Sequence, residues 1–162
     1  MDLLFKHAWI MLIAVTIANG LIMKYRSKKY ISENPSLDEG YDKYFKGWIL
    51  YGNIPWIIIA IGNLSGLTHS IFDYFNPKAM NPIVLIFHSA IVILWILSVW
   101  WVYFKGGAEF IESHPGLFKK SSLSGNTNVT AKQVKLFLPL MLLGGIMAMI
   151  MMWNGNFLGP QF

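Results

Sequence analysis

The sequence predicts an all-α, polytopic membrane protein, a bundle of four transmembrane helices with both termini on the outer side. Three observations predict this fold class. Hydrophobic residues make up 55% of the 162 residues and charged residues only 13%, whereas soluble domains carry about 25% charged residues. Four apolar runs are each close to the length of about 20 residues that a helix needs to cross a bilayer. The basic residues gather in two of the segments between these runs.

The four apolar runs are the predicted spans. At a rise of about 1.5 Å per residue, each run matches the hydrocarbon thickness of a bilayer. The runs lack the polar face of a helix on the surface of a soluble domain, which excludes a soluble helical protein. Together they form a single membrane domain, with spans at about residues 3–23, 47–67, 82–104 and 136–153.

The distribution of charge predicts the orientation. Eleven of the 13 lysines and arginines lie in segments 24–46 and 105–135, and only Lys6 and Lys78 lie elsewhere. Because short cytoplasmic segments are enriched in basic residues, both segments are predicted to be cytoplasmic loops. The termini and residues 68–81 then face outward. We expect an integral protein of a bacterial inner (plasma) membrane, surrounded by membrane lipid and without a nucleic-acid partner.

The first basic loop carries a helical pattern. Ser36 and Glu39 have the spacing of a capping box, in which each side chain accepts a hydrogen bond from the other residue's backbone N–H. Apolar residues then recur at helical spacing. This pattern predicts a short amphipathic helix on the inner membrane surface. Its apolar face would consist of Leu37, Tyr41, Tyr44, Phe45 and Trp48.

The second basic loop is less regular. Gly106 and Gly107 predict the end of the preceding helix, because glycine adopts conformations that stop a helix. Residues 121–130 are polar and have no hydrophobic period, which is typical of a linker. Neither loop therefore predicts a separate folded domain.

Small residues recur four positions apart in three of the spans. Helices in lipid associate by close packing, and small residues let their backbones approach. Packing within the bundle is the simplest interpretation. Their number also predicts a homo-oligomer or an association with other membrane subunits. The pairs are Ala14–Ala18, Gly62–Gly66 and Gly144–Ala148.

Candidate cofactor ligands lie near the predicted outer face. His7 and His88 lie four and six residues inside the outer ends of their spans, within about 10 Å of the surface. Two imidazoles on different helices could hold the iron of haem b or hydrogen-bond a quinone. His69 and Asn63 lie close by in depth, and the glycine pair of the second span would leave space for a porphyrin. The competing interpretation is that these polar groups pair with each other or with water.

Several function classes are excluded or disfavoured. The absence of cysteine excludes disulfides, thiolate metal sites and cysteine nucleophiles. The sequence contains no phosphate-binding glycine loop, HExxH or GxSxG motif. No charged residue lies at the middle of a span, which argues against a proton-coupled transporter or ion pump.

These observations favour a non-enzymatic subunit of a self-associating or larger membrane complex. The alternative is a redox membrane protein that binds b-type haem or a quinone near the outer face through His7 and His88. A small-solute channel or pore is the third hypothesis. No catalytic residue is predicted.

Overall fold

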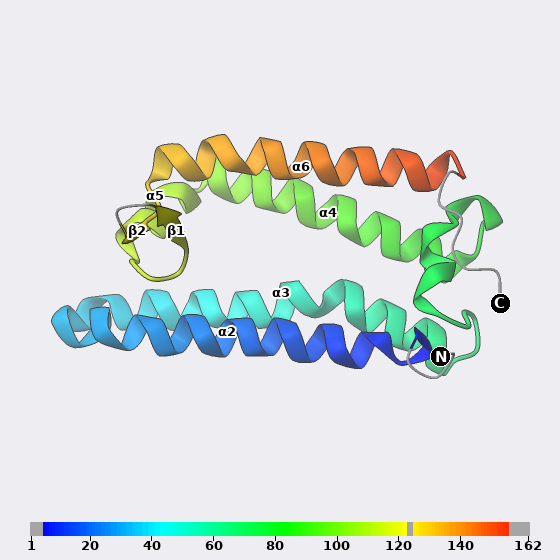
Figure 1. Ribbon diagram of the computed structural model, residues 1–162, viewed down its shortest axis with the longest axis horizontal. Coiled ribbons are helices and arrows are strands. Elements are labelled where there is room, and N and C mark those ends of the chain that lie inside the picture. Colours follow the sequence, from blue (N-terminus) through cyan, green and yellow to red (C-terminus); the bar gives the residue numbers. More distant parts are fainter. Residues whose placement is uncertain (1–4, 123–124, 156–162) are drawn as a thin grey trace.

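The computed structural model describes residues 5–122 and 125–155, and four long helices dominate it (Figure 1). Each helix is long and apolar enough to cross a membrane, which confirms the predicted all-α membrane fold. Residues 3 and 4 of the first predicted span lie outside the described residues. The helices are α2 (Ala8–Glu33), α3 (Asp38–Leu64), α4 (Pro82–Phe104) and α6 (Ala131–Trp153).

Three of the four long helices have other bounds than the predicted spans, and α6 begins at Ala131 rather than at residue 136. The bounds of α4 agree with the third predicted span, but α2 and α3 both extend far into the predicted loop 24–46. Only Asn34 and the short 3-10 helix η1 (Pro35–Leu37) separate them. The polar ends of α2 and α3 remain helical because they carry charge pairs at i, i+4 spacing, which support an exposed helix. These pairs are Lys29–Glu33, Lys43–Glu39 and Lys46–Asp42.

The predicted capping box is also wrong. The Asn34 side chain accepts a hydrogen bond from the Ser36 hydroxyl at 2.7 Å and from the Ser36 backbone N–H at 3.3 Å. Ser36 therefore belongs to the turn, and α3 begins after Leu37 without a side-chain cap. Glu39 instead pairs with Lys43 at 2.6 Å, and this ammonium group lowers the pKa of the Glu39 carboxyl.

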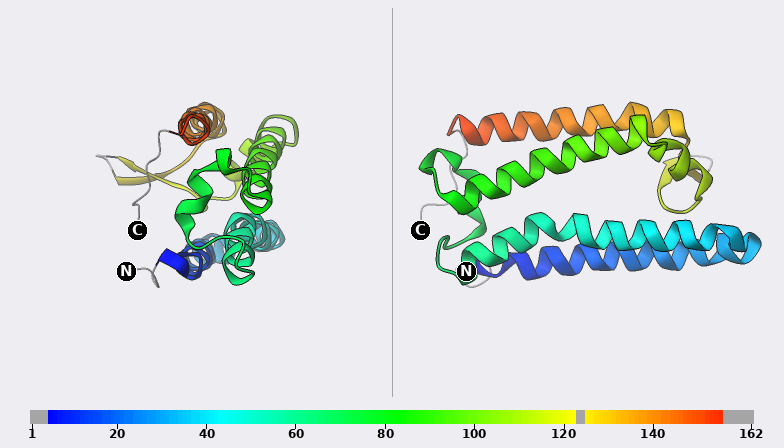
Figure 2. Two further views of the ribbon diagram at one scale, coloured as in Figure 1. Left: turned by 90° about the vertical axis from the view of Figure 1, so that its right-hand side faces the viewer. Right: turned by 180° about the vertical axis from the view of Figure 1, so that it is seen from behind.

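The helices follow one another as an open series. α2 packs along α3, α3 packs against α4, and α4 packs against α6. α6 therefore lies apart from the α2–α3 pair (Figure 2). We call the end that carries residues 68–81 the η2 end, after the 3-10 helix η2 (Ile71–Phe75), and the opposite end the α5 end, after the short helix α5 (Gly107–Ser113). The described ends of the chain, at α2 and α6, both lie at the η2 end.

Thr16 is at the centre of the contact between α2 and α3. Its backbone carbonyl accepts a hydrogen bond from the Trp48 indole at 3.3 Å, and its hydroxyl accepts one from the Trp56 indole at 3.2 Å. A polar group inside a bilayer needs a partner within the protein, because lipid chains supply none. The two indoles of α3 therefore find their acceptors on α2 and fix the register of the helix pair.

The apolar face predicted to lie on the membrane instead forms a core at the α5 end. Tyr41 and Phe45 are buried with Met23 and Leu117. The ring of Tyr44 contacts aromatic rings of α4 and of the segment around α5. The predicted helical period is confirmed, but the face is covered by residues far along the chain, such as Leu117.

The residues that follow α5 dock on α3 through Tyr41. The Tyr41 hydroxyl donates a hydrogen bond to the Pro115 carbonyl at 2.6 Å, and burial raises the pKa of this hydroxyl to about 12. The buried His114 ring stacks on Phe110, with 3.9 Å between ring centroids. Gly40 lies under this ring, and a Cβ there would collide with Nε2 of His114.

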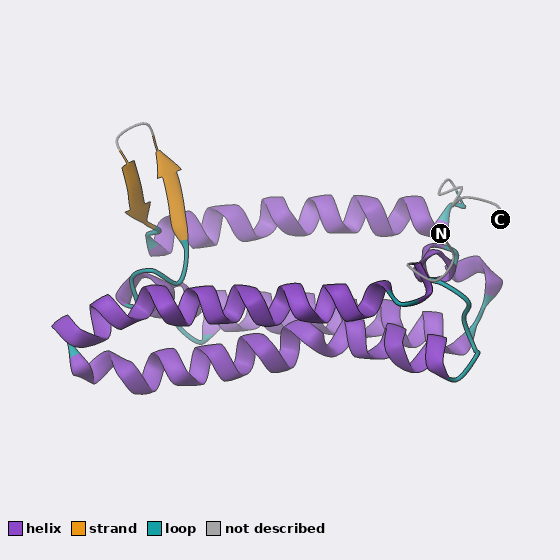
Figure 3. Ribbon diagram, turned by 60° about the horizontal axis from the view of Figure 1, so that its bottom comes forward, coloured by secondary structure: helices purple, strands orange, loops and turns teal. Residues whose placement is uncertain are grey.

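The predicted polar linker contains a β-hairpin. Strands β1 (Lys119–Ser122) and β2 (Gly125–Asn128) pair antiparallel, with Lys119 opposite Asn128. The hairpin projects from the α5 end of the molecule (Figure 3). Residues 123 and 124 lie outside the described residues. The Asn128 side chain accepts a hydrogen bond from the Gly116 N–H at 3.2 Å, which ties the hairpin to the loop before it.

Removal of the Tyr41 hydroxyl tests this docking. Tyr41→Phe keeps the buried ring but loses the hydrogen bond to Pro115, a net loss of about 0.5–1.5 kcal/mol. We expect amide hydrogen exchange in α5 to accelerate roughly two- to tenfold, measured by mass spectrometry in detergent micelles. Tyr25→Phe is the matched control, because the Tyr25 side chain is exposed. Equal exchange in the two variants would show that α5 does not depend on this bond.

Candidate functional site

Residues 68–81 are folded by their own side chains. The Asp73 carboxylate accepts hydrogen bonds from the backbone N–H groups of His69 at 2.5 Å and Ser70 at 3.3 Å. Ser70 and Asp73 thereby form the capping box of η2. Asn81 caps the start of α4 and donates from Nδ2 to the Leu67 carbonyl at 2.7 Å. These bonds turn the loop back over the helices and place Tyr74 against them.

Tyr74 is fully buried and belongs to a hydrogen-bonded network at the η2 end. Its hydroxyl lies 3.4 Å from the Thr68 hydroxyl and 3.3 Å from the Ile58 carbonyl. Thr68 in turn donates to Oδ1 of Asn63 at 2.6 Å. Nδ2 of Asn63 donates to the Lys6 carbonyl at 2.7 Å. The network thus connects the start of α2, the end of α3 and the loop.

The space beside Gly62, where a porphyrin was expected to fit, is occupied by side chains of this protein. A Cβ on Gly62 would collide with the hydroxyls of Tyr74 and Thr68, so these side chains occupy the space beside it. Gly66 lies after the end of α3 and has a φ of 75°, which favours glycine. The predicted pair is therefore not one helix face, because Gly62 admits Tyr74 and Gly66 ends the helix.

His88 is joined to the network through the Tyr74 backbone. Its Nε2 lies 2.9 Å from the Tyr74 carbonyl. Since a carbonyl only accepts hydrogen bonds, Nε2 carries the proton, and Nδ1 of the neutral ring is an acceptor. The side chain is 4% exposed, and among the described residues its buried Nδ1 has no hydrogen-bond partner. The Trp153 ring lies edge-on to it, with 5.9 Å between centroids.

The other two predicted site residues lie beside the network. His7 precedes α2 and is half-buried, and its ring contacts Trp9 at 6.3 Å between centroids. His69 is exposed. The structure therefore joins Asn63 to His88 through Thr68 and Tyr74, and it reaches His7 only through the neighbouring Lys6 carbonyl. No group of three or more potential metal ligands occurs within residues 5–122 and 125–155.

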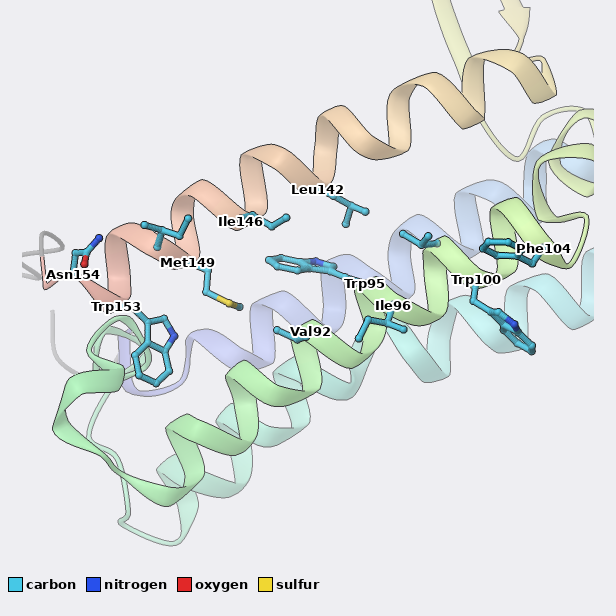
Figure 4. A pocket seen from close by; sticks show the side chains of 12 residues that line it. Val92, Trp95, Ile96, Trp100, Phe104, Leu142, Ile146, Met149, Trp153 and Asn154 are labelled. Carbon is cyan, nitrogen blue, oxygen red and sulfur yellow. The ribbon is translucent and has the colours of Figure 1, made fainter.

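An apolar groove of about 900 Å³ runs between α4 and α6 (Figure 4). Trp95 lies in its middle and packs against Gly145, where a Cβ would collide with the indole ring. Side chains of both helices form the walls. They include Val92, Ile96, Val99, Leu142, Ile146 and Trp153.

Polar contacts hold α6 at both ends of this groove. At the α5 end, the Tyr103 hydroxyl donates to the Lys135 carbonyl and the Lys135 ammonium pairs with Glu109, both at 2.5 Å. This ammonium group lowers the pKa of the Glu109 carboxyl. At the η2 end, the Lys78 ammonium donates to the Asn154 carbonyl at 3.1 Å. Between these ends, contact with α4 is mainly apolar.

Sequence reasoning missed Tyr74, Thr68 and the groove. Tyr74 lies in an aromatic loop, and nothing in its immediate neighbours distinguishes it from the half-buried rings of Phe72 and Phe75. The sequence indicates one wall of the groove only weakly, since His88, Val92 and Val99 recur at helical spacing on α4. Its second wall depends on which helix packs against this face, and that information is absent from one helix alone.

Comparison with known proteins assigns no family to this chain. Neither a protein-family model nor a curated protein nor a solved structure matches the chain. The roles given below to individual side chains therefore rest on their contacts and chemistry.

A glycine substitution tests the Tyr74 network. In Gly62→Ala the new methyl group meets the Tyr74 and Thr68 hydroxyls, and we expect a loss of about 1–3 kcal/mol of stability from overpacking. The measurement is the thermal unfolding midpoint of the purified protein in one detergent. Gly47→Ala is the control, because a Cβ there would meet no atom closer than the Tyr51 ring at 3.9 Å. A midpoint equally unaffected in both variants would refute the close approach at Gly62.

Proposed function

We propose that this protein is a non-enzymatic subunit of a self-associating or larger membrane complex. The observation that carries the proposal is the exposure of α6. Within the described residues, none of the most apolar stretch of α6 is buried, whereas 33% of the corresponding stretch of η1 and α3 is buried. A second membrane helix packed on α6 would supply the contacts that its own chain does not.

The small residues on the exposed faces support the same proposal. Ala14 and Ala18 on α2 are exposed, and a Cβ on Gly144 of α6 would meet nothing within 4 Å. In lipid, such positions let a neighbouring backbone approach closely. The Gly62–Gly66 pair no longer belongs to this argument, because Tyr74 covers Gly62.

Photo-crosslinking in native membranes tests the association. The chain has no cysteine, so a benzophenone maleimide attached to the variant Gly144→Cys labels one position. We expect a crosslinked product heavier than the monomer, either a dimer of this chain or an adduct with another membrane protein. Met149→Cys is the control, because Met149 lines the groove facing α4. A monomer alone after illumination of the Gly144→Cys variant would contradict the proposal.

The second candidate function is a redox protein that binds haem b or a quinone through His7 and His88. The unpartnered, buried Nδ1 of His88 favours a ligand of the quinone–quinol pair over haem, because the reduced form can donate a hydrogen bond to it. Bis-histidine haem would need His7 and His88 on opposite sides of one iron, but His7 reaches the network of His88 only through the neighbouring Lys6 carbonyl. The channel hypothesis gains no support, because the groove between α4 and α6 is apolar.

The proposed orientation places the η2 end and both termini outside a bacterial inner membrane. The distribution of lysine and arginine supports it, because residues 24–46 and 105–135 carry most of the basic side chains and meet at the α5 end.

Single-cysteine labelling of intact cells tests this orientation. Met80 at the η2 end and Lys28 near the α5 end are both exposed. We expect a membrane-impermeant maleimide to label Met80→Cys in intact cells and Lys28→Cys only after permeabilisation. The reverse pattern would invert the proposed topology, and labelling of both variants in intact cells would contradict it.

A further inference from the structure

The groove between α4 and α6 leads to the buried imidazole of His88. His88, Val92, Trp95 and Val99 lie at positions i, i+4, i+7 and i+11 and therefore share one face of α4. Three of these residues line the groove, and His88 is one turn beyond Val92. The Trp153 ring lines the groove and also contacts the His88 ring. At this end the groove is lined by Trp153 and Asn154, and the His88 imidazole lies against the Trp153 indole (Figure 4).

That atom, Nδ1 of His88, is an acceptor that lacks a donor. The Tyr74 carbonyl holds the proton on Nε2, so the ring cannot satisfy Nδ1 by changing its tautomer. Among the described residues no side chain or backbone N–H reaches Nδ1. A buried acceptor without a donor is costly, above all at membrane depth. The chemistry of the site therefore calls for a hydrogen-bond donor, and a hydroxyl group can supply it.

The depth of His88 limits what can carry this hydroxyl. His88 lies six residues into α4, about 9 Å along the helix axis. A charged or zwitterionic head group is expensive at such a depth, which favours a neutral one. Phe87 and Trp153 contact the imidazole edge-on, and aromatic edges and faces of this kind also receive a flat ring. The volume of the groove lies within the range of ligand pockets, about 300–1,000 Å³.

We propose that the groove binds the reduced form of a membrane quinone, a quinol. Its hydroxyl donates a hydrogen bond to Nδ1 of His88, its ring lies against Trp153, and its isoprenoid tail follows the apolar walls between α4 and α6. Trp153 is the last residue of α6 and is 40% exposed, so it can turn aside to admit the ring. This inference rests on the second candidate function and narrows it to one redox state.

The preference for the reduced form follows from hydrogen-bond complementarity. The oxygens of an oxidised quinone only accept hydrogen bonds, and the neutral His88 ring presents a second acceptor to them. A quinol hydroxyl instead supplies the missing donor. A phospholipid acyl chain would also fill the apolar groove, but it places no hydroxyl beside Nδ1.

The test compares both redox forms of one ligand. Purified protein in detergent is titrated with a decyl-tailed benzoquinol and, separately, with its oxidised quinone, and binding is followed by quenching of tryptophan fluorescence. We expect the quinol to bind at least about tenfold more tightly, the equivalent of about 1.4 kcal/mol. Equal affinity for the two forms would overturn the inference and leave the second candidate function standing. No binding of either form would overturn both the inference and the quinone alternative of the second candidate function.

Variants of His88 identify the acceptor. His88→Gln retains an N–H donor for the Tyr74 carbonyl and an oxygen acceptor, so we expect the quinol preference to persist. His88→Phe keeps a ring of similar shape but removes the acceptor, and the preference should fall to within about twofold. An unchanged preference in His88→Phe would exclude Nδ1 as the contact.

Variants of the groove keep the inference testable if His88→Phe fails to fold. Ile146 lines the groove, whereas Leu143 is exposed on the same helix and is not part of its lining. We expect Ile146→Phe to weaken quinol binding at least about fivefold, with Leu143→Phe close to the wild type. Equal binding by the two variants would place the ligand elsewhere. None of these results bears on the crosslinking at Gly144, which tests the proposed subunit function separately.

Discussion

The insertion of Tyr74 beside Gly62 is the contact on which the η2 end depends. Residues 68–81 fold back onto the helices because the Tyr74 hydroxyl reaches the backbone of α3, and only a residue without a Cβ at position 62 leaves room for it. The Tyr74 carbonyl also accepts a hydrogen bond from the Nε2–H of His88. One tyrosine therefore connects α3 with α4 through its two polar groups and sets the tautomer of the candidate site.

The sequence predicted the helices that cross the membrane far better than the contacts between them. The bounds of α4 followed from composition, because Asn81 and Pro82 mark its start and an apolar run fills it. The period of Tyr41 and Phe45 was equally visible, yet their cover comes from Leu117, far along the chain. A hydrophobic period shows that one face of a helix is buried, but it does not show which residues cover that face.

In the candidate site, too, the residues within the helices were easier to predict than their contacts with the loop. Asn63 and His88 stood out in the sequence because polar side chains are costly inside a span, and both belong to the network. Tyr74 and Thr68 join them through contacts that the loop alone creates. The Gly62–Gly66 spacing was misleading. Two glycines four residues apart lie on one face only if the helix continues through both, and α3 ends at Leu64.

The assignment of the candidate site depends on one state of His88, in which the Tyr74 carbonyl holds the proton on Nε2 and Nδ1 is a buried acceptor. The imidazole ¹⁵N chemical shifts of the ligand-free protein test it most directly, with His88→Gln used to assign the signals among the four histidines. We expect the shifts of a neutral ring in which Nε2 carries the proton and Nδ1 has neither a proton nor a hydrogen bond. A protonated Nδ1 would contradict this assignment.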